Sequence, residues 1–135
     1  MIIEQKVNKW AGTKARQDNR ADVSRAAFIM DLVAMATGIP AAQIACRTRN
    51  HARAARARQV AMYLAYIAYG WPLARVGTAF ARDRTTAGHA CRLIEEMRDD
   101  AAFDARLEAL ETCLRAAPDP QAVKLLSPNL LEMAC

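Results

Sequence analysis

Residues 73–98 decide the fold, and they read Leu73-Ala-Arg-Val-Gly-Thr-Ala-Phe-Ala-Arg-Asp-Arg-Thr-Thr-Ala-Gly-His-Ala-Cys-Arg-Leu-Ile-Glu-Glu-Met-Arg98. The stretch predicts one helix over about residues 73–80 and a second over residues 84–97, for which Asp83 is a suitable N-cap. Apolar residues of the second segment recur at spacings of three and four, as on one face of a helix. Two helices joined by a tight turn at residues 81–83 match the pattern of a helix-turn-helix.

The rest of the chain also favours helices, so we predict an all-α fold, a compact helical bundle. Alanine, the best helix former, is frequent, whereas glycine and proline number five each. Further helices are predicted over residues 23–37, over a short turn from Pro40 to Ile44, over a long segment ending at Tyr69, and over a last segment ending near Arg115. Local signals set their ends: Asp22 or Ser24 and Asp99 or Asp100 as N-caps, and Gly38 and Gly70 as stops.

We expect one folded domain at residues 23–116, because a chain of 135 residues can bury a core without metals or disulfides. Residues 1–22 show no hydrophobic period and are expected to form a flexible N-terminal arm. Residues 117–135 follow the last predicted helix and carry several leucines. They are expected to form a C-terminal tail, which is a candidate contact for a partner.

The charge of the chain is unevenly distributed. From Leu32 to Arg82 there is no acid and there are seven arginines, whereas residues 95–111 hold seven acids and two arginines. The formal net charge is +5. Because a basic surface attracts polyanions, of which nucleic acid is the commonest, this distribution favours a nucleic-acid-binding protein.

The residue patterns of an enzyme, a metalloprotein or a membrane protein do not occur in this sequence. The four cysteines form no CxxC, the histidines are His51 and His89, and no nucleophile–base pair or acid pair shares a predicted helix face. We therefore expect no catalytic residue, no metal and no cofactor. The N-terminus does not read as a signal peptide and no apolar run is long enough to span a membrane, which predicts a cytoplasmic protein.

The second helix of the pair offers side chains that suit a DNA groove. Its first turns carry Arg84, Thr85, Thr86, His89 and Arg92, and its acids lie only at the far end. The N-terminal residues of a recognition helix reach base edges. Arginine pairs with guanine through two hydrogen bonds, and threonine offers a hydroxyl and a methyl group. We therefore predict that this helix reads the major groove of double-stranded DNA.

Two blocks of sequence occur in an order known from one family. Residues 81–95 read Ala-Arg-Asp-Arg-Thr-Thr-Ala-Gly-His-Ala-Cys-Arg-Leu-Ile-Glu, and residues 56–64 read Arg-Ala-Arg-Gln-Val-Ala-Met-Tyr-Leu. They resemble Gly-Gly-Arg-Asp-His-Thr-Thr-Val-x-His-Ala-Cys-Arg-x-Ile-Glu and Arg-Pro-Arg-Gln-Ile-Ala-Met-Tyr-Leu in the C-terminal DNA-binding domain of the bacterial replication initiator DnaA. The resemblance covers residues 23–115 and implies the helix-turn-helix bundle of that domain, of the kind also found in the Trp repressor.

The resemblance also implies a division of roles among the polar residues. A basic loop that contacts phosphates and enters a minor groove corresponds to Arg47, Arg49 and Arg53. The start of the long helix, which holds the DNA backbone, corresponds to Arg56, Arg58 and Gln59. The reading positions of the family correspond to Arg82, Asp83, Thr85, Thr86 and His89.

The sequence departs from the family pattern in the second helix. Arg84 replaces a histidine, Ala87 and Gly88 remove side chain from the middle of the helix, and one residue of the Gly-Gly turn is missing. These changes predict that the DNA box of the initiator is not read unchanged. The chain also has no GxxxxGK[ST] phosphate loop, so it resembles a free-standing version of the domain without the ATPase module.

We predict that the protein is a sequence-specific transcriptional regulator located at the bacterial nucleoid. Free-standing domains of this kind resemble regulators of gene expression, including activators of phage-derived gene clusters, and the tail is a candidate contact for RNA polymerase or another regulator. Two alternatives stay open: a replication modulator that competes with the initiator for its boxes, and an interaction module whose former DNA surface binds protein. The oligomeric state is left open as well.

Overall fold

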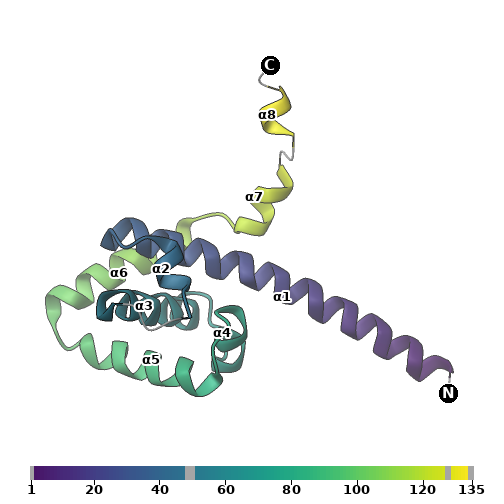
Figure 1. Ribbon diagram of the computed structural model, residues 1–135, viewed down its shortest axis with the longest axis horizontal. Helices are drawn as coiled ribbons and strands as arrows, with labels where there is room; N and C mark the ends of the chain where they lie inside the picture. Colours follow the sequence, from purple (N-terminus) through teal and green to yellow (C-terminus); the bar gives the residue numbers. More distant parts are fainter. Residues whose placement is uncertain (1, 48–50, 127–128, 134–135) are drawn as a thin grey trace.

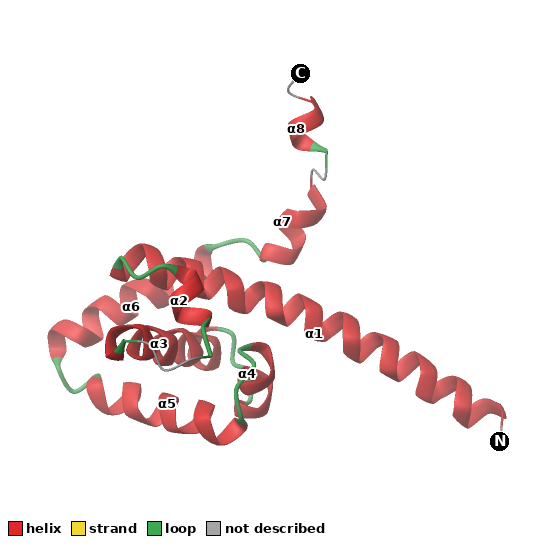
Figure 2. Cartoon of the chain, in the orientation of Figure 1, coloured by secondary structure: helices red, strands yellow, loops and turns green. Residues whose placement is uncertain are grey.

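The computed structural model describes residues 2–47, 51–126 and 129–133, and every regular element in these ranges is an α-helix (Figures 1 and 2). In chain order the helices are α1 (Ile2–Thr37), α2 (Ala41–Ala45), α3 (Ala52–Ala68), α4 (Leu73–Ala79), α5 (Arg84–Met97), α6 (Ala101–Ala116), α7 (Pro120–Leu126) and α8 (Leu130–Met133). The predicted all-α bundle is confirmed, and α4 and α5 end within one residue of their predicted bounds. None of the helices in the described ranges is both long enough and apolar enough to cross a lipid bilayer.

Helix α3 is the centre of the bundle, and α1, α4, α5 and α6 contact it (Figure 1). All residues from Val60 to Ala65 are buried, so neighbours enclose this stretch of the helix instead of covering a single stripe. The surrounding helices supply other large buried side chains, among them Ile29, Val33, Ile94 and Leu107. Because burying one such side chain stabilises a fold by about 1.5–3 kcal/mol, this packing holds α5 firmly on the bundle.

Helix α1 begins at Ile2, so the predicted helix start at Val23 is wrong, and residues 2–22 of the expected arm are helical. The first turns of α1 extend beyond the bundle (Figure 1). Residues 2–22 contain no proline, one glycine and many good helix formers, so a helix that is stabilised by packing near Ile29 continues toward the N-terminus without a hydrophobic period of its own. Asp22, a predicted cap, instead lies inside the helix and is buried.

A cluster of two acids and two arginines joins α1 to α4 and to the segment before α7. Arg75 donates to the Asp22 carboxylate from Nε at 2.7 Å and from Nη2 at 2.9 Å. Arg25 donates to Asp22 at 3.0 Å and to the two oxygens of Asp119 at 3.1 and 2.9 Å. Arg75 also lies over the Trp71 ring, 4.6 Å from its centroid. One arginine of the acid-free stretch is therefore neutralised by an acid from α1.

We expect the Asp22 cluster to make the fold sensitive to acid. The hydrogen bonds from Arg75, with a smaller contribution from Arg25, hold the pKa of Asp22 below its ordinary value of 3.8. A carboxyl group whose pKa is lower in the folded than in the unfolded chain stabilises the fold above about pH 4 and loses that contribution as the pH falls further. In urea unfolding between about pH 6 and pH 3, the free energy of unfolding should therefore fall less for Asp22→Asn than for the wild type.

The control for this experiment is Asp31→Asn, which changes an exposed aspartate of the same helix. Its unfolding free energy should follow that of the wild type across the pH range. If Asp22→Asn and the wild type lost equal stability on acidification, the acid sensitivity would not come from this cluster.

The short helices α7 and α8 form the C-terminal tail, which extends away from the bundle (Figure 1). Asp119, just before α7, attaches the tail to Arg25 of α1. The apolar side chains beyond it are exposed, namely Val123, Leu126, Leu130, Leu131 and Met133. A concentration of exposed apolar side chains on one segment marks a candidate contact surface.

Candidate nucleic-acid interface

The turn between α4 and α5 lies directly on α4 because a glycine stands where they meet. The Arg82 backbone N–H donates to the Gly77 carbonyl oxygen at 2.8 Å. A Cβ atom on Gly77 would lie 2.7 Å from the Arg82 carbonyl oxygen and 3.2 Å from the Arg84 nitrogen. Gly77 therefore determines how closely the start of α5 approaches α4. The sequence prediction missed Gly77, although a glycine inside a predicted helix is a signal of packing or function.

The turn also places Ala81 in the left-handed conformation, with φ 55°. This conformation costs an L-residue about 1 kcal/mol of conformational free energy, whereas glycine adopts it without strain. We expect Ala81→Gly to raise the free energy of unfolding by up to about 1 kcal/mol in urea titrations. The matched control Ala109→Gly, at an exposed position inside α6, should instead lower it by about 1 kcal/mol. A loss of stability in Ala81→Gly would contradict the assignment of strain to this turn.

Helix α5 presents one side to the core and the opposite side outward. The buried side consists of Ala87, Ala90, Cys91 and Ile94. The predicted reading residues of the helix are all exposed, namely Arg84, Thr85, Thr86, His89 and Arg92. Asp83 stands at the N-cap position as predicted and is exposed, but in the described structure its carboxylate accepts no capping hydrogen bond. Its oxygens therefore stay available to a ligand at the start of α5.

Two of the three departures from the family pattern in α5 point inward. Ala87 is fully buried, and a Cβ atom on Gly88 would lie 3.4 Å from Cδ1 of Leu73. The side chain that these two residues remove from the middle of the helix therefore lies on the side that faces α4 and the core. Arg84 is exposed, so a changed sequence preference would depend on Arg84.

Arg58 and Arg82 donate hydrogen bonds to backbone carbonyls near the end of α2. Arg58 donates from Nε to the Ile44 oxygen at 2.7 Å and from Nη2 to the Cys46 oxygen at 2.8 Å. Arg82 donates from Nη2 to the same Cys46 oxygen at 2.8 Å and from Nη1 to the Ala81 oxygen at 3.2 Å. Burial, together with the neighbouring charge of Arg82, lowers the pKa of Arg58 below its ordinary value. Both guanidinium groups therefore use some of their N–H donors in hydrogen bonds within the protein.

The other predicted residues around the start of α3 differ in exposure. Arg47 and Arg53 are exposed, and neither forms an ion pair within the described ranges. Arg56 is exposed and donates to a methionine sulfur at the far end of α5, at 3.2 Å. Gln59 is half-buried. Arg49 lies outside the described residues, so its predicted role stays a prediction.

A polar network that the sequence prediction missed anchors the far end of α5. Tyr63 of α3 donates a hydrogen bond to Glu95, and burial with this bond raises the pKa of Tyr63 to about 12. Arg98, just after α5, donates to the Tyr63 hydroxyl at 3.0 Å, to Glu111 at 2.7 Å and to Asp104 at 2.5 Å. The last two residues belong to α6. The network therefore fixes α5 relative to both α3 and α6.

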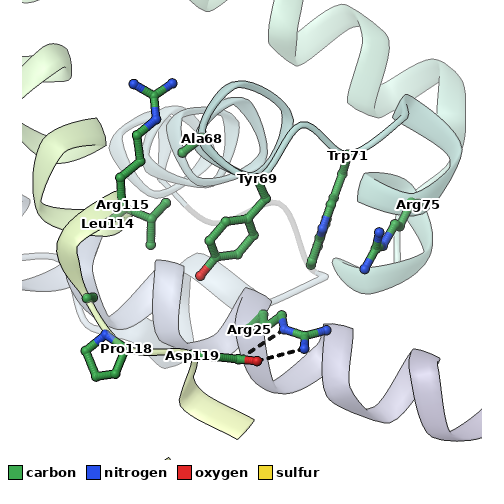
Figure 3. Close-up of a pocket in the computed structure, with 10 residues that line it drawn as sticks. Arg25, Ala68, Tyr69, Trp71, Arg75, Leu114, Arg115, Pro118 and Asp119 are labelled. Carbon is green, nitrogen blue, oxygen red and sulfur yellow. Dashed lines mark hydrogen bonds and ion pairs between the residues drawn. The ribbon is translucent and has the colours of Figure 1, made fainter. Parts of the chain in front are cut away.

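A pocket elsewhere on the bundle is lined by residues of α1, the α3–α4 connection and the end of α6 (Figure 3). The Tyr69 ring lies there between a leucine of α6 and Trp71, and Arg25 reaches Asp119 across the opening. Arg25 and Arg75 in this pocket are paired with acids. Arg47 and Arg84 are exposed and form no ion pair within the described residues, so they form a better surface for a polyanion than this pocket does.

A turn-linked helix pair whose second helix exposes arginine, threonine and histidine from its first turns defines a helix-turn-helix DNA-binding protein. The chain belongs to the bacterial DnaA helix-turn-helix family, because the profile described as "Bacterial dnaA protein helix-turn-helix" matches residues 26–94. The chain is also similar to the crystal structure of a DNA replication initiation factor, with a TM-score of 0.65 and 28% identity, over 83% of this chain and 35% of that chain. It therefore spans about a third of the length of that initiation factor.

Proposed function

We propose that the protein is a sequence-specific transcriptional regulator that binds double-stranded promoter DNA in the bacterial cytoplasm, at the nucleoid. Helix α5 enters the major groove, and the basic segment 47–58 follows the DNA backbone and the adjacent minor groove. One observation carries this proposal. The outward side of α5 exposes a row of polar side chains, namely Arg84, Thr85, Thr86, His89 and Arg92, and the hydrogen bond from Arg82 to the Cys46 oxygen brings the exposed Arg47 close to the start of that helix.

The arrangement of charge supports the same orientation on DNA. The free N–H groups at the start of α5 favour phosphate, and the groove is wide enough to admit an α-helix. The acids of α5 begin at Glu95, at the opposite end, where Tyr63 donates to that carboxylate. In this orientation the base edges meet Asp83 and the exposed side chains of the first turns, while the loop arginines meet phosphates. Within α5, which begins after Asp83, the acids are kept away from the base edges.

The proposal is tested by selecting bound sequences from a random duplex pool and by mapping bound sites in cells. One enriched motif, peaks at promoters and an affinity that falls steeply with rising salt are expected, because each neutralised phosphate releases counterions. No measurable binding to any duplex in dilute salt would overturn DNA binding. Peaks confined to the replication origin would overturn the assignment to transcription.

Arg84→Ala is expected to weaken binding to the selected sequence by about 1–3 kcal/mol, roughly 5- to 150-fold, and to relax specificity at one base pair. The reason is that an arginine in the first turn of a recognition helix makes a bidentate contact to guanine. The control is Arg106→Ala, which removes the same charge from an exposed position of α6. Titrations of duplexes varied at each position measure both effects. An equal loss on all sequences would show that Arg84 contacts a phosphate instead.

A replication modulator is the second candidate, because the chain retains the reading residues of the DnaA family. These are Arg82, Asp83, Thr85, Thr86 and His89. Such a protein would compete with the initiator for its DNA boxes. Titration of a labelled initiator box against a scrambled duplex tests this candidate, and equal affinity for the two duplexes would remove it.

The exposed apolar side chains of α7 and α8 support one further part of the proposal, which is contact with RNA polymerase or another regulator. This contact would place an activating surface on the tail while α5 holds the promoter. If the duplex selection finds no binding, the protein is instead an interaction module that does not bind DNA.

A further inference from the structure

We propose that Arg58 and Arg82 act as positioning residues, which clamp the Cys46 carbonyl and thereby hold the adjacent Arg47 beside the turn before α5. The inference rests on the proposed function, because the loop matters as a DNA-binding element. It reverses the expectation that both side chains contact DNA directly.

Three elements meet at one backbone oxygen. Arg58 comes from α3 and Arg82 from the turn before α5, and each donates from Nη2 to the Cys46 oxygen at 2.8 Å. Arg58 also donates from Nε to the Ile44 oxygen at 2.7 Å. The last carbonyls of a helix have no partner inside that helix, so the end of the five-residue α2 offers acceptors that arginine donors can satisfy.

The clamped oxygen lies at the point where the basic loop begins. The Cys46 carbonyl and the Arg47 nitrogen belong to one planar peptide unit, so fixing the oxygen also fixes the direction in which the chain leaves toward Arg47. Arg82 precedes Asp83 and the first residue of α5. The clamp therefore sets Arg47 and the reading residues in one spatial register, as readout of two adjacent grooves requires.

The hydrogen bonds of the two side chains, together with their burial, favour positioning over direct contact with DNA. Arg58 uses Nε and Nη2, and Arg82 uses Nη1 and Nη2, on backbone oxygens. Arg58 and Arg82 are half-buried, whereas Arg47, Arg53 and Arg92 are exposed. The two clamp residues therefore act on DNA through the loop, and the exposed arginines act on it directly.

A double-mutant cycle on the selected duplex tests the proposal. Arg58→Ala, Arg58→Lys, Arg82→Ala and Arg47→Ala are compared by affinity and by the slope of log K against log salt. Each single clamp variant should weaken binding on the order of tenfold and lower the salt slope by more than the unit expected for one lost phosphate contact. Arg58→Lys should behave like Arg58→Ala, because an ammonium keeps the charge and loses the fork that bridges two carbonyls.

Coupling between sites gives the decisive readout. Arg47→Ala should cost little in the Arg58→Ala or Arg82→Ala background, whereas the control Arg92→Ala should cost the same in every background. Additive effects of Arg47→Ala and Arg58→Ala, with binding restored by Arg58→Lys, would overturn the proposal and make Arg58 a phosphate contact. Thermal unfolding of each variant shows that it is folded, and Arg82→Ala tests the clamp without changing α3.

A measurement without DNA separates failure of the clamp from failure of the proposed function. Amide hydrogen exchange at Ile44 and Cys46, whose N–H groups donate to the Pro40 and Gln43 oxygens, should accelerate at least several-fold in Arg58→Ala and in Arg82→Ala, relative to the amides of α6. Unchanged exchange at Ile44 and Cys46 in both variants would overturn the clamp even if the protein binds DNA. Accelerated exchange in a protein that binds no duplex would uphold the clamp and reject the proposed function.

Discussion

Gly77→Ala is expected to lower the free energy of unfolding by about 2–3 kcal/mol and to weaken sequence-specific DNA binding at least tenfold. The added Cβ would lie 2.7 Å from the Arg82 carbonyl oxygen, which is a backbone atom and not the end of a flexible side chain. The helix propensity that alanine gains over glycine, about 1 kcal/mol, is too small to offset this overlap. The turn must move, and α5 moves with it, so the reading residues lose their position.

Urea unfolding and duplex titration measure the two effects. Gly88→Ala is the matched control, because the same substitution in α5 places a Cβ at 3.4 Å from the Leu73 side chain, an ordinary contact distance. This variant should gain up to about 1 kcal/mol of stability. If Gly77→Ala were as stable as the wild type, α4 and the turn would not be held together by this close approach.

Arg98→Met is expected to destabilise the protein by about 2–3 kcal/mol, because it leaves a buried carboxylate without its main partner. The Glu111 side chain is 8% exposed and accepts from Arg98 at 2.7 Å, whereas Arg115 lies 3.8 Å away from it. The same change removes the donor to the Tyr63 hydroxyl. Methionine keeps an unbranched apolar stem in place of the arginine methylenes, so the loss reflects hydrogen bonding and charge more than packing.

The double variant Arg98→Met/Glu111→Leu should recover most of this loss, because removing both partners of a buried pair leaves no unpaired charge. Arg106→Met, on the exposed surface of α6, is the control and should change the free energy of unfolding by less than about 0.5 kcal/mol. Thermal unfolding of the four proteins measures the difference. No recovery in the double variant would show that Arg98 stabilises the fold by packing instead of by its pairing with Glu111.

Most helix boundaries could be predicted because they depend on residues within one turn. Asp100 caps α6 by accepting from the Ala102 and Phe103 nitrogens, as its predicted role requires. Gly38 and Gly70 have φ values of 76° and 67° and follow α1 and α3 as predicted stops. The start of α1 was predicted wrongly, because the hydrophobic period ends near Val23 while helix propensity continues beyond it.

The outward face of α5 could also be predicted, since helical spacing alone separates Ala87 and Ile94 from Arg84 and His89. The partners of the other arginines could not be predicted from the sequence. The sequence alone does not show whether an arginine binds a phosphate, a carboxylate or a carbonyl group. Arg75 pairs with Asp22, which lies 53 residues away, and this pairing removes one cation from the basic stretch.

The order of residues along the chain was sufficient to predict the helices and the polar side of α5, because both depend on neighbours three or four positions apart, and it also contains the two blocks that resemble DnaA. Only the tertiary structure shows that Gly77 packs against the turn, that Arg98 pairs with an acid of α6, and that Arg82 donates to a carbonyl 36 residues away. Those contacts join segments that only folding brings together. These contacts form because the neighbouring helices enclose α3, and no local sequence pattern predicts that arrangement.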